Sequence, residues 1–486
     1  VSFILPGNSA TGGYEVANSL RFNSASSDYL SRTPSSTGNR RTFTISCWVK
    51  RSTLTASGKN IMVAWDGSKS SASFGSAIYF NSSDQIEVDH DIAGADYTFN
   101  TNMVFRDVSA WYHIVLAVDT TQATESNRQK IYVNGSQVDL TESALGFPTQ
   151  NFDTYFNTSS GENNIGSNYF TAGYADQYMA EFVLIDGQAL DATSFGEFDS
   201  DSPNIWKPID VSGLTFGTNG FYLDFENSGS LGADVSGNGN NFTANNLTSI
   251  DQTTDTCTNN FCTLMSNDPS ASNFTLSDGN LVVSKSGSGT FGLYGSSIML
   301  TKGKWYYESK ITDLGSSDRS RMGVAAYESV TSTSTIQGSF SGFEFTGDTG
   351  GRFSITVNGS TTEIDGFHSY AQGDIIMWAI DMDNSKLYIG KNGDWFNYNS
   401  ANTGGDPTSG NGFVTNNTTA LAAPLTVGYV GHAAGVSDST EVKINFGNPP
   451  FTISSGNSDA EGFGNFEYAV PSGYFAICTK NLAEYG

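Results

Sequence analysis

The chain has 486 residues, 53 of them glycine, and aromatic residues make up 13% while charged residues make up only 15%. Long helices need runs of Ala, Leu, Glu, Lys and Arg, and no such run here exceeds about two turns, so we expect an all-β protein. The formal net charge of −26, from 49 acidic and 23 basic residues, repels phosphate groups, which excludes nucleic acid and anionic membranes as expected partners.

The opening residues, Val-Ser-Phe-Ile-Leu-Pro-Gly, lack a basic region and a long apolar core, so they are not expected to form a signal peptide. No stretch approaches the roughly 18 apolar residues that a membrane-spanning helix needs. We therefore expect a protein made in the cytoplasm, with no membrane insertion.

Residues 43–50, Phe-Thr-Ile-Ser-Cys-Trp-Val-Lys, alternate so that the apolar residues at odd positions from 43 to 49 share one face of a strand. Residues 111–119 predict a second apolar strand, and its His113 is interpreted as a core histidine. Residues 131–138 predict a hairpin, because Asn134-Gly135 is a strong signal for a tight turn between strands.

These segments, followed by Ala-Glu-Phe-Val-Leu-Ile-Asp-Gly-Gln-Ala-Leu at 180–190, resemble in their order the laminin-G (concanavalin A-like) jelly roll over residues 17–200. The resemblance implies a two-sheet sandwich with an aromatic core, and we place this domain at residues 1–202.

Within this domain, Glu87-Val-Asp89-His-Asp91 places three carboxylates on one strand face. The pattern is close to the Glu-x-Asp-x-Glu of a retaining glucanase, which needs two carboxylates about 5–5.5 Å apart. Asp91 is one methylene shorter than that pattern requires, so an ordinary solvent-facing strand is favoured. We expect no enzymatic activity, and polysaccharide hydrolysis by Glu87 and Asp89 stays as an alternative.

Sugar-binding sites combine aromatic faces with a few polar groups. The loops between residues 151 and 178 are rich in both, and the residues near position 65 are expected close by. The residues expected to contact a ligand in this domain are Trp65, Asp153, Tyr155, Phe156, Tyr169, Phe170 and Tyr174.

Residues 203–279 are interpreted as an irregular connecting segment. Its Gly/Asn-rich turn at 234–240 resembles the opening of a laminin-G repeat, and a calcium-binding loop there is an alternative; no other cofactor is expected. Cys257 and Cys262 form either a small-loop disulfide or two free thiols, and the sequence leaves both open.

Strands resume at residue 280. The segments Gly-Lys-Trp-Tyr-Tyr-Glu at 303–308, Gly-Asp-Ile-Ile at 373–376, Lys-Asn-Gly at 391–393 and Asn-Phe-Gly at 445–447 resemble a SPRY domain in order and spacing. We place a SPRY-like β-sandwich with a C-terminal extension at 280–486. Trp395 and Phe396 follow a turn and are expected to be exposed ligand contacts. The expected fold is thus two antiparallel β-sandwich (jelly-roll) domains in tandem.

The whole chain also resembles lectin-like fibre and decoration proteins of tailed bacteriophages, especially marine ones, through residues 2–14, 214–225 and 475–483. This resemblance implies a non-enzymatic virion surface protein, expected as a homo-oligomer, that adheres to host-surface glycan or protein. The alternative is a purely structural decoration protein that binds only other virion subunits.

Overall fold

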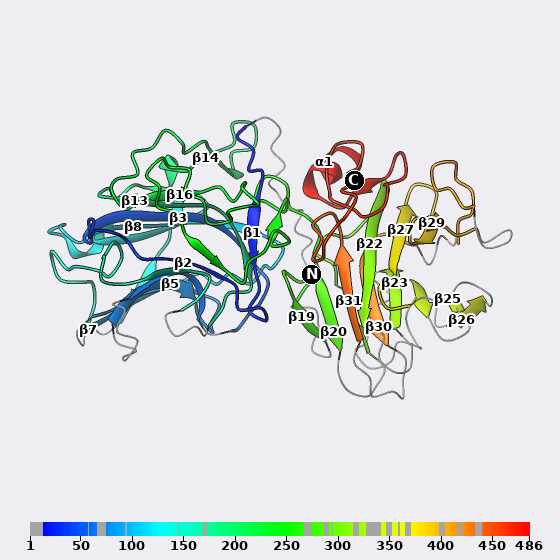
Figure 1. Cartoon of the computed structure of the whole chain (residues 1–486), viewed down its shortest axis with the longest axis horizontal. Helices are drawn as coiled ribbons and strands as arrows, with labels where there is room; N and C mark the ends of the chain where they lie inside the picture. The colour runs from blue at the N-terminus through cyan, green and yellow to red at the C-terminus, as the bar shows by residue number, and fades with distance from the viewer. Residues whose placement is uncertain are drawn as a thin grey trace. The chain divides into compact units, whose positions relative to one another are not determined.

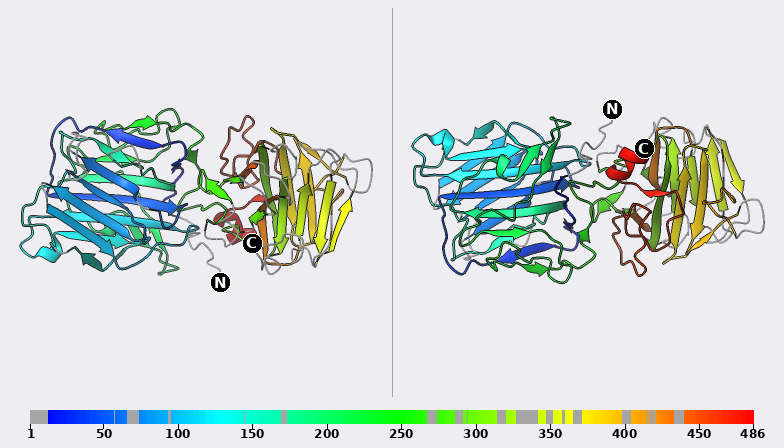
Figure 2. Two further views of the ribbon diagram at one scale, coloured as in Figure 1. Left: turned by 90° about the horizontal axis from the view of Figure 1, so that it is seen from below. Right: turned by 90° about the horizontal axis from the view of Figure 1, so that it is seen from above.

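The computed structural model is nearly all β-structure and divides into two units, the first covering residues 6–260 and the second beginning at residue 261. Figure 2 shows the strands of each unit running side by side. The structure describes residues 13–56, 58–65, 74–92, 95–143, 145–168, 173–266, 274–285, 291–293, 295–313, 320–326, 342–346, 352–357, 360–364, 371–397, 404–414, 416, 418, 421–432 and 440–486.

One sheet of the first unit is centred on the predicted strand at residues 43–50, which is β3. Its strand order is β10-β9-β8-β3-β13-β1-β18, with β16 also paired to β13. The predicted Asn134-Gly135 turn joins β9 to β10, and both residues have positive φ, as such a turn requires. The strands are β1 (Ser19–Phe22), β3 (Thr42–Arg51), β8 (Trp111–Asp119), β9 (Gln129–Val133), β10 (Ser136–Gln137), β13 (Gln177–Asp186), β16 (Phe221–Leu223) and β18 (Gln252–Thr253).

The second sheet of this unit has the order β11-β7-β6-β5-β4-β12-β2-β17. In Figure 1, β3 and β13 lie in one layer, and β5 and β7 lie in the layer below it. The strands are β2 (Tyr29–Arg32), β4 (Lys59–Trp65), β5 (Phe74–Phe80), β6 (Ile86–Ile92), β7 (Ala95–Thr101), β11 (Leu140–Glu142), β12 (Asn163–Ile165) and β17 (Thr243–Asn245).

The main core of the first unit lies between these two sheets. It contains Phe43, Ile45, Cys47 and Val49, which confirms the predicted alternation of β3. The opposite face of β3 packs Trp48 under a covering layer that contains η2 and the hairpin of β14 and β15. The elements of this unit outside the two sheets are η1 (Glu125–Asn127), η2 (Ala192–Ser194), β14 (Gly196–Phe198) and β15 (Trp206–Pro208).

His113 lies in this covered face and is a core histidine, as the sequence predicted. Its Nδ1 accepts a hydrogen bond from Trp206 Nε1 at 2.9 Å, and its Nε2 lies 2.9 Å from Ser46 Oγ. Burial lowers the pKa of His113 to about 3, so the ring is neutral at physiological pH.

Residues 203–260 do not form the separate connecting segment that the sequence suggested. Three of their strands complete the first sandwich: β16 pairs with β13, β17 pairs with β2, and β18 pairs with β1. The segment adds a strand to both sheets, and the first unit accordingly ends at Asn260. The irregular sequence reflects strands of two or three residues, which are too short to show a period.

The second unit also contains two mainly antiparallel sheets, with its main core between them. The predicted strands of the SPRY-like pattern are present as β22, β27, β28 and β31. One sheet has the order β19-β20-β31-β22-β27-β28-β29 with β32 beside β22, and the other has the order β21-β30-β23-β24-β25-β26. The elements are β19 (Thr275–Ser277), β20 (Val282–Lys285), β21 (Phe291–Leu293), β22 (Lys304–Asp313), β23 (Ser320–Ala326), β24 (Gly342–Thr346), β25 (Arg352–Val357), β26 (Ser360–Ile364), β27 (Ile375–Asp381), β28 (Lys386–Lys391), β29 (Asp394–Trp395), β30 (Leu425–His432), β31 (Thr440–Asn445), β32 (Phe475–Ala476) and α1 (Thr479–Tyr485).

The C-terminal extension covers the outer face of β22. Glu308 is fully buried there, and its carboxylate accepts hydrogen bonds from the backbone N–H groups of Glu467 and Tyr468, from the Tyr306 hydroxyl at 2.9 Å and from Asn445 Nδ2 at 3.2 Å. Burial raises the pKa of Glu308, and these donors offset part of that effect. The extension is therefore part of the second sandwich.

All four cysteines are free and buried. Cys257 belongs to the covered face of the first unit and Cys262 to the core of the second, so each behaves as a small apolar core residue.

A buried ion pair fastens the end of the first unit to its central strand. Lys50 Nζ lies 2.8 Å from Asp255 Oδ2 and 2.7 Å from Asn260 Oδ1, and the side chains of Lys50 and Asp255 are 1% and 0% exposed. Trp111 Nε1 donates to the other Asp255 oxygen at 3.2 Å.

Replacing Asp255 with Ala should destabilise the first unit by about 3–5 kcal/mol, because Lys50 loses the carboxylate that compensates its buried charge. Urea unfolding of the full chain measures this as a lower midpoint for the first unit. The exposed Asp139→Ala is the matched control and should stay within about 0.5 kcal/mol. A wild-type midpoint for Asp255→Ala would contradict the claim that residues 203–260 belong to this sandwich.

Candidate functional site

The outer face of the sheet that contains β4–β7 is where the sequence-predicted carboxylates gather. In β6, Ile86, Val88 and His90 are buried toward the core, so the alternating Glu87 and Asp89 point to the other face. Asp91 continues this alternation. The prediction that these three carboxylates share one strand face is confirmed.

The neighbouring strand β7 adds a fourth carboxylate to this face. Its Tyr97 and Phe99 belong to the core, so Asp96, Thr98 and Asn100 are on the outer side. The register places Asp96 beside Asp91, Thr98 beside Asp89 and Asn100 beside Glu87. Sequence reasoning missed Asp96 and Asn100, although the alternation of Ala-Asp-Tyr-Thr-Phe-Asn-Thr carries the signal.

On the other side of β6, strand β5 presents small side chains. Ile78 and Phe80 enter the core, which leaves Gly75, Ala77 and Tyr79 on the outer face. Gly75 pairs with Asp91, and Ala77 pairs with Asp89. The carboxylates therefore border two small residues, and on the far side of these β4 places Val63 beside Ala77 and Trp65 beside Gly75.

Neutral donors hold Glu87. The Tyr79 hydroxyl donates to one of its carboxylate oxygens, and Asn81 Nδ2 donates to the other at 2.9 Å. Asn81 Nδ2 also donates to Asn100 Oδ1 at 2.8 Å. Tyr79, Glu87, Asn81 and Asn100 thus form one hydrogen-bonded row, in which Asn81 connects Glu87 to Asn100.

Asp89 has a different environment, because it is partly buried among other acids. Burial, the charge of Asp96 and its side-chain hydrogen bond, and the charges of Asp91 and Glu87 together raise the pKa of Asp89 to about 7. Its Oδ1 is buried and accepts no hydrogen bond from the residues that the structure describes. Near neutral pH this carboxyl is therefore protonated in a large fraction of molecules, and it can donate a hydrogen bond as well as accept one.

The predicted aromatic cluster is only partly at the surface. Trp65 and Phe396 are each 3% exposed and Phe156 is 0% exposed. Phe156 and Phe396 fill the cores of their units, and a ligand does not reach them in this structure. Phe156 and Phe396 were predicted as contacts because aromatic density in a loop does not reveal which rings turn inward. Trp65 instead ends β4, where it pairs with Gly75 of the candidate face.

The remaining predicted contacts fall into separate surroundings. Asp153 forms an ion pair with Arg41 at 2.7 Å, with both side chains more than 40% exposed, and the Arg40 guanidinium lies 5.5 Å from the centre of the Tyr155 ring. Tyr174 lies near Tyr29, with ring centres 6.1 Å apart.

Trp395 is half-buried, and its ring centre lies 6.3 Å from that of Tyr306. Tyr169 and Phe170 lie outside the described residues.

In the turn at 234–240, the Asp234 carboxylate stabilises the local backbone. Asp234 accepts backbone N–H bonds from Tyr222 at 3.0 Å, Ser236 at 2.9 Å and Asn240 at 2.7 Å. Across the described part of the chain, no group of three or more His, Cys, Asp or Glu side chains is arranged to hold a metal ion. The calcium alternative therefore gains no support from this turn.

Glu181 is a buried carboxyl that sequence reasoning missed, although an acid within the apolar run Met-Ala-Glu-Phe-Val-Leu-Ile is its signal. It lies at a bulge of β13, with φ of +49°, and accepts hydrogen bonds from the Tyr222 hydroxyl at 2.7 Å and the Tyr14 hydroxyl at 3.2 Å. Burial raises the pKa of Glu181 to about 7.

The residues 24–184 match a protein family described as the concanavalin A-like lectin/glucanases superfamily. The matched region contains the carboxylate face of β6 and β7. No curated protein sequence matches the chain. No helix in the described residues is both long and apolar enough to cross a membrane.

Three solved structures show a remote similarity to this chain. Domains LG4-5 of the mouse laminin alpha1 chain are 8% identical, with 95% of this chain and 99% of that chain covered and a TM-score of 0.29. A human SPRY domain is 18% identical, with 35% and 94% covered and a TM-score of 0.25. A putative carbohydrate binding protein from Bacteroides ovatus is 16% identical, with 48% and 59% covered and a TM-score of 0.30.

Replacing Glu181 with Gln should change how stability depends on pH. The raised pKa means that the share of stability linked to Glu181 is fully present below about pH 4.5 and is lost as pH rises through about 7. Glutamine cannot ionise, so Glu181→Gln should be more stable than wild type at pH 8, by up to about 3 kcal/mol, and close to wild type at pH 4.

Thermal unfolding at both pH values measures this difference. Glu142→Gln, at an exposed position of β11, is the control and should show no such pH-dependent gain. An equal effect of Glu181→Gln at pH 4 and pH 8 would show that folding does not raise the pKa of Glu181.

Proposed function

We propose that the first unit binds a glycan on the outer face of β5, β6 and β7, and that the protein acts by adhesion without catalysing a reaction. The observation that carries this proposal is the row of Tyr79, Glu87 and Asn100 beside the small residues Gly75 and Ala77. Carboxylate and amide groups fixed by their neighbours can pair with sugar hydroxyls at little entropic cost.

Two further observations support this location. The opposite sheet of the first unit is covered on its outer side by residues of the 187–216 region, which pack on Trp48 and Val183. In contrast, Glu87, Asp89, Asp91 and Ala77 are half-buried and Asp96 is exposed, so they are accessible to a ligand. The description of the family that matches residues 24–184 names lectins and glucanases, and both kinds of protein bind carbohydrates.

A polysaccharide hydrolase is the second candidate, and one observation favours it. An acid with a pKa near 7, here Asp89, next to a second carboxylate, here Glu87, is the pairing that glycoside hydrolysis uses. Against it, Asp91 is one methylene shorter than the third acid of the glucanase pattern. We therefore favour binding.

Glu87→Gln should weaken binding of the best-bound glycan about 10- to 100-fold, because a hydrogen bond to a charged group contributes about 1.5–3 kcal/mol. A glycan array with the full chain identifies that glycan, and titration calorimetry compares the variants. Glu142→Gln makes the same chemical change at an exposed position of β11 and should bind as wild type does.

The same proteins decide between adhesion and hydrolysis. Incubation of wild type with the bound glycan should release no new reducing ends. If wild type releases new reducing ends and Glu87→Gln does not, the proposal of a non-enzymatic protein is overturned. If no glycan on the array binds, the proposed ligand class is overturned.

We further propose that the protein is displayed as an oligomer on the surface of a virus particle, as a fibre, tail or capsid appendage that attaches to host-surface glycan. The resemblance of residues 2–14, 214–225 and 475–483 to phage fibre and decoration proteins supports this proposal. Antibody labelling of intact particles in the electron microscope should place the chain on their surface. Labelling confined to lysate debris would contradict it, and a chain buried between virion subunits on every face would favour a cementing role instead.

A further inference from the structure

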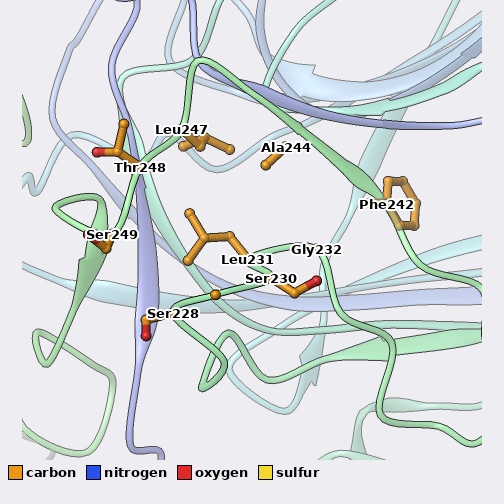
Figure 3. Close-up of a pocket in the computed structure, with 10 residues that line it drawn as sticks. Ser228, Ser230, Leu231, Gly232, Phe242, Ala244, Leu247, Thr248 and Ser249 are labelled. Atoms are coloured by element: carbon orange, nitrogen blue, oxygen red, sulfur yellow. The ribbon is translucent and has the colours of Figure 1, made fainter.

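A hollow opens at the edge of the first sandwich, away from the carboxylate row. It lies between the turn at 228–232 and the stretch at 242–249, and its volume is about 260 Å³ (Figure 3). Both walls come from the segment that completes the two sheets, so the hollow exists only because residues 203–260 belong to this unit.

The bottom of the hollow is apolar. Leu231 and Phe242 are each 5% exposed and belong to the core between the sheets, and Leu247 packs against the same core. Figure 3 places Leu231 in the centre, between the two walls, with Leu247 and Ala244 across from it. A ligand in the hollow would rest on the outermost atoms of the core.

The mouth of the hollow carries hydroxyl groups. Ser228, Ser230 and Ser249 line it and are exposed, and in the described structure their hydroxyls are not engaged by other protein groups. Thr248 differs, because its hydroxyl donates to Asp251 Oδ2 at 3.1 Å. None of the lining residues is charged.

Backbone hydrogen bonds fix both walls. Phe242 N–H donates to the Gly232 carbonyl at 2.8 Å, and Thr248 N–H donates to Asp251 Oδ2 at 2.7 Å. A Cβ atom on Gly232 would lie 2.2 Å from the Phe242 carbonyl oxygen, so glycine is needed for this close approach. Fixed walls reduce the ordering cost that a ligand would otherwise meet on binding.

Size and chemistry together limit the ligand. The volume is below the roughly 300–1,000 Å³ of pockets for drug-sized molecules, which fits a single ring. An ionised group would find no opposite charge on the lining, and its desolvation would be uncompensated. A neutral sugar ring combines one C–H face, which suits Leu231, with hydroxyls that can pair with the three serines.

We propose that this hollow is a second sugar-binding site of the first unit, which takes one uncharged pyranose ring. It is independent of the proposed site on the outer face of β5–β7. A chain with both sites would hold a branched or repeating glycan at two points, and linking two weak sites raises the overall affinity without any new contact.

Blocking the hollow tests this proposal. Ala244 lines it and is exposed on β17, so Ala244→Trp should fill it, and Thr243→Trp puts the same ring at the adjacent exposed position of the same strand as a matched control. The probes are the methyl glycosides of glucose, galactose, mannose and N-acetylglucosamine, with glycerol as the acyclic comparison. Ligand-observed saturation-transfer NMR on the full chain measures binding.

At least one methyl glycoside should bind to wild type, to Thr243→Trp and to Glu87→Gln, and its dissociation constant should rise at least 10-fold in Ala244→Trp. Unchanged binding in Ala244→Trp with loss in Glu87→Gln would overturn the second site and leave the proposed function standing. Loss in Ala244→Trp with wild-type binding in Glu87→Gln supports the second site, and the site on β5–β7 is tested separately by titration of Glu87→Gln with the best-bound glycan. No binding by any of the four glycosides, or equal binding of glycerol, would overturn the proposal.

Thermal unfolding of Ala244→Trp distinguishes a filled hollow from a destabilised protein. A midpoint equal to that of Thr243→Trp shows that a loss of binding comes from the filled hollow. If Ala244→Trp does not fold, the double variant Ser230→Ala, Ser249→Ala removes two of the hydroxyls without adding volume, and it should lower affinity by at least 5-fold. Wild-type affinity in that variant would overturn the proposal.

Discussion

The ion pair between Lys50 and Asp255 is the interaction on which the first unit depends. Both side chains are almost completely buried, so the two charges are compensated mainly by each other and by the amide of Asn260 and the indole of Trp111. Lys50 is on β3, at the centre of its sheet, while Asp255 follows the last strand of the unit. The pair therefore attaches residues 203–260 to the central strand of the sheet that contains β3. That segment supplies an edge strand to the sheet that contains β4–β7 and both walls of the hollow.

The outer faces of the sheets are covered by different segments in the two units. In the first unit, residues of the 187–216 region cover the sheet that contains β3, and His113 lies between the rings of Trp48 and Trp206 with its hydrogen bonds satisfied. In the second unit, the C-terminal extension covers β22 through Glu308. The face of β5–β7 carries half-buried and exposed polar groups instead, and this difference is why the account places ligand binding there.

Much of the fold follows from local sequence patterns. The alternation of β3 predicts which of its residues enter the core, and Asn134-Gly135 predicts the hairpin, because both depend on residues that are close in the chain. The membership of residues 203–260 in the first sandwich does not follow, since β16, β17 and β18 are short and pair with strands far away in sequence. Only the tertiary pairing decides where they belong.

The same distinction applies to the site. The shared face of Glu87 and Asp89 follows from the two-residue period of a strand, and it was predicted correctly. Which aromatic rings are buried does not follow, because a loop has no period: Phe156 and Phe396 enter the core while Tyr174 stays near the surface. Asp96 becomes relevant only through the register of β6 with β7. Short-range patterns thus identify the strands of the site, and long-range pairing assembles it.

The most direct test of a glycan site on β5–β7 is a crystal structure of the full chain grown with its best-bound oligosaccharide. The account predicts sugar density against the outer face of these strands, with hydroxyls within hydrogen-bonding distance of Glu87 and Asn100. Sugar density found only elsewhere on the molecule, with that face occupied by solvent alone, would contradict it.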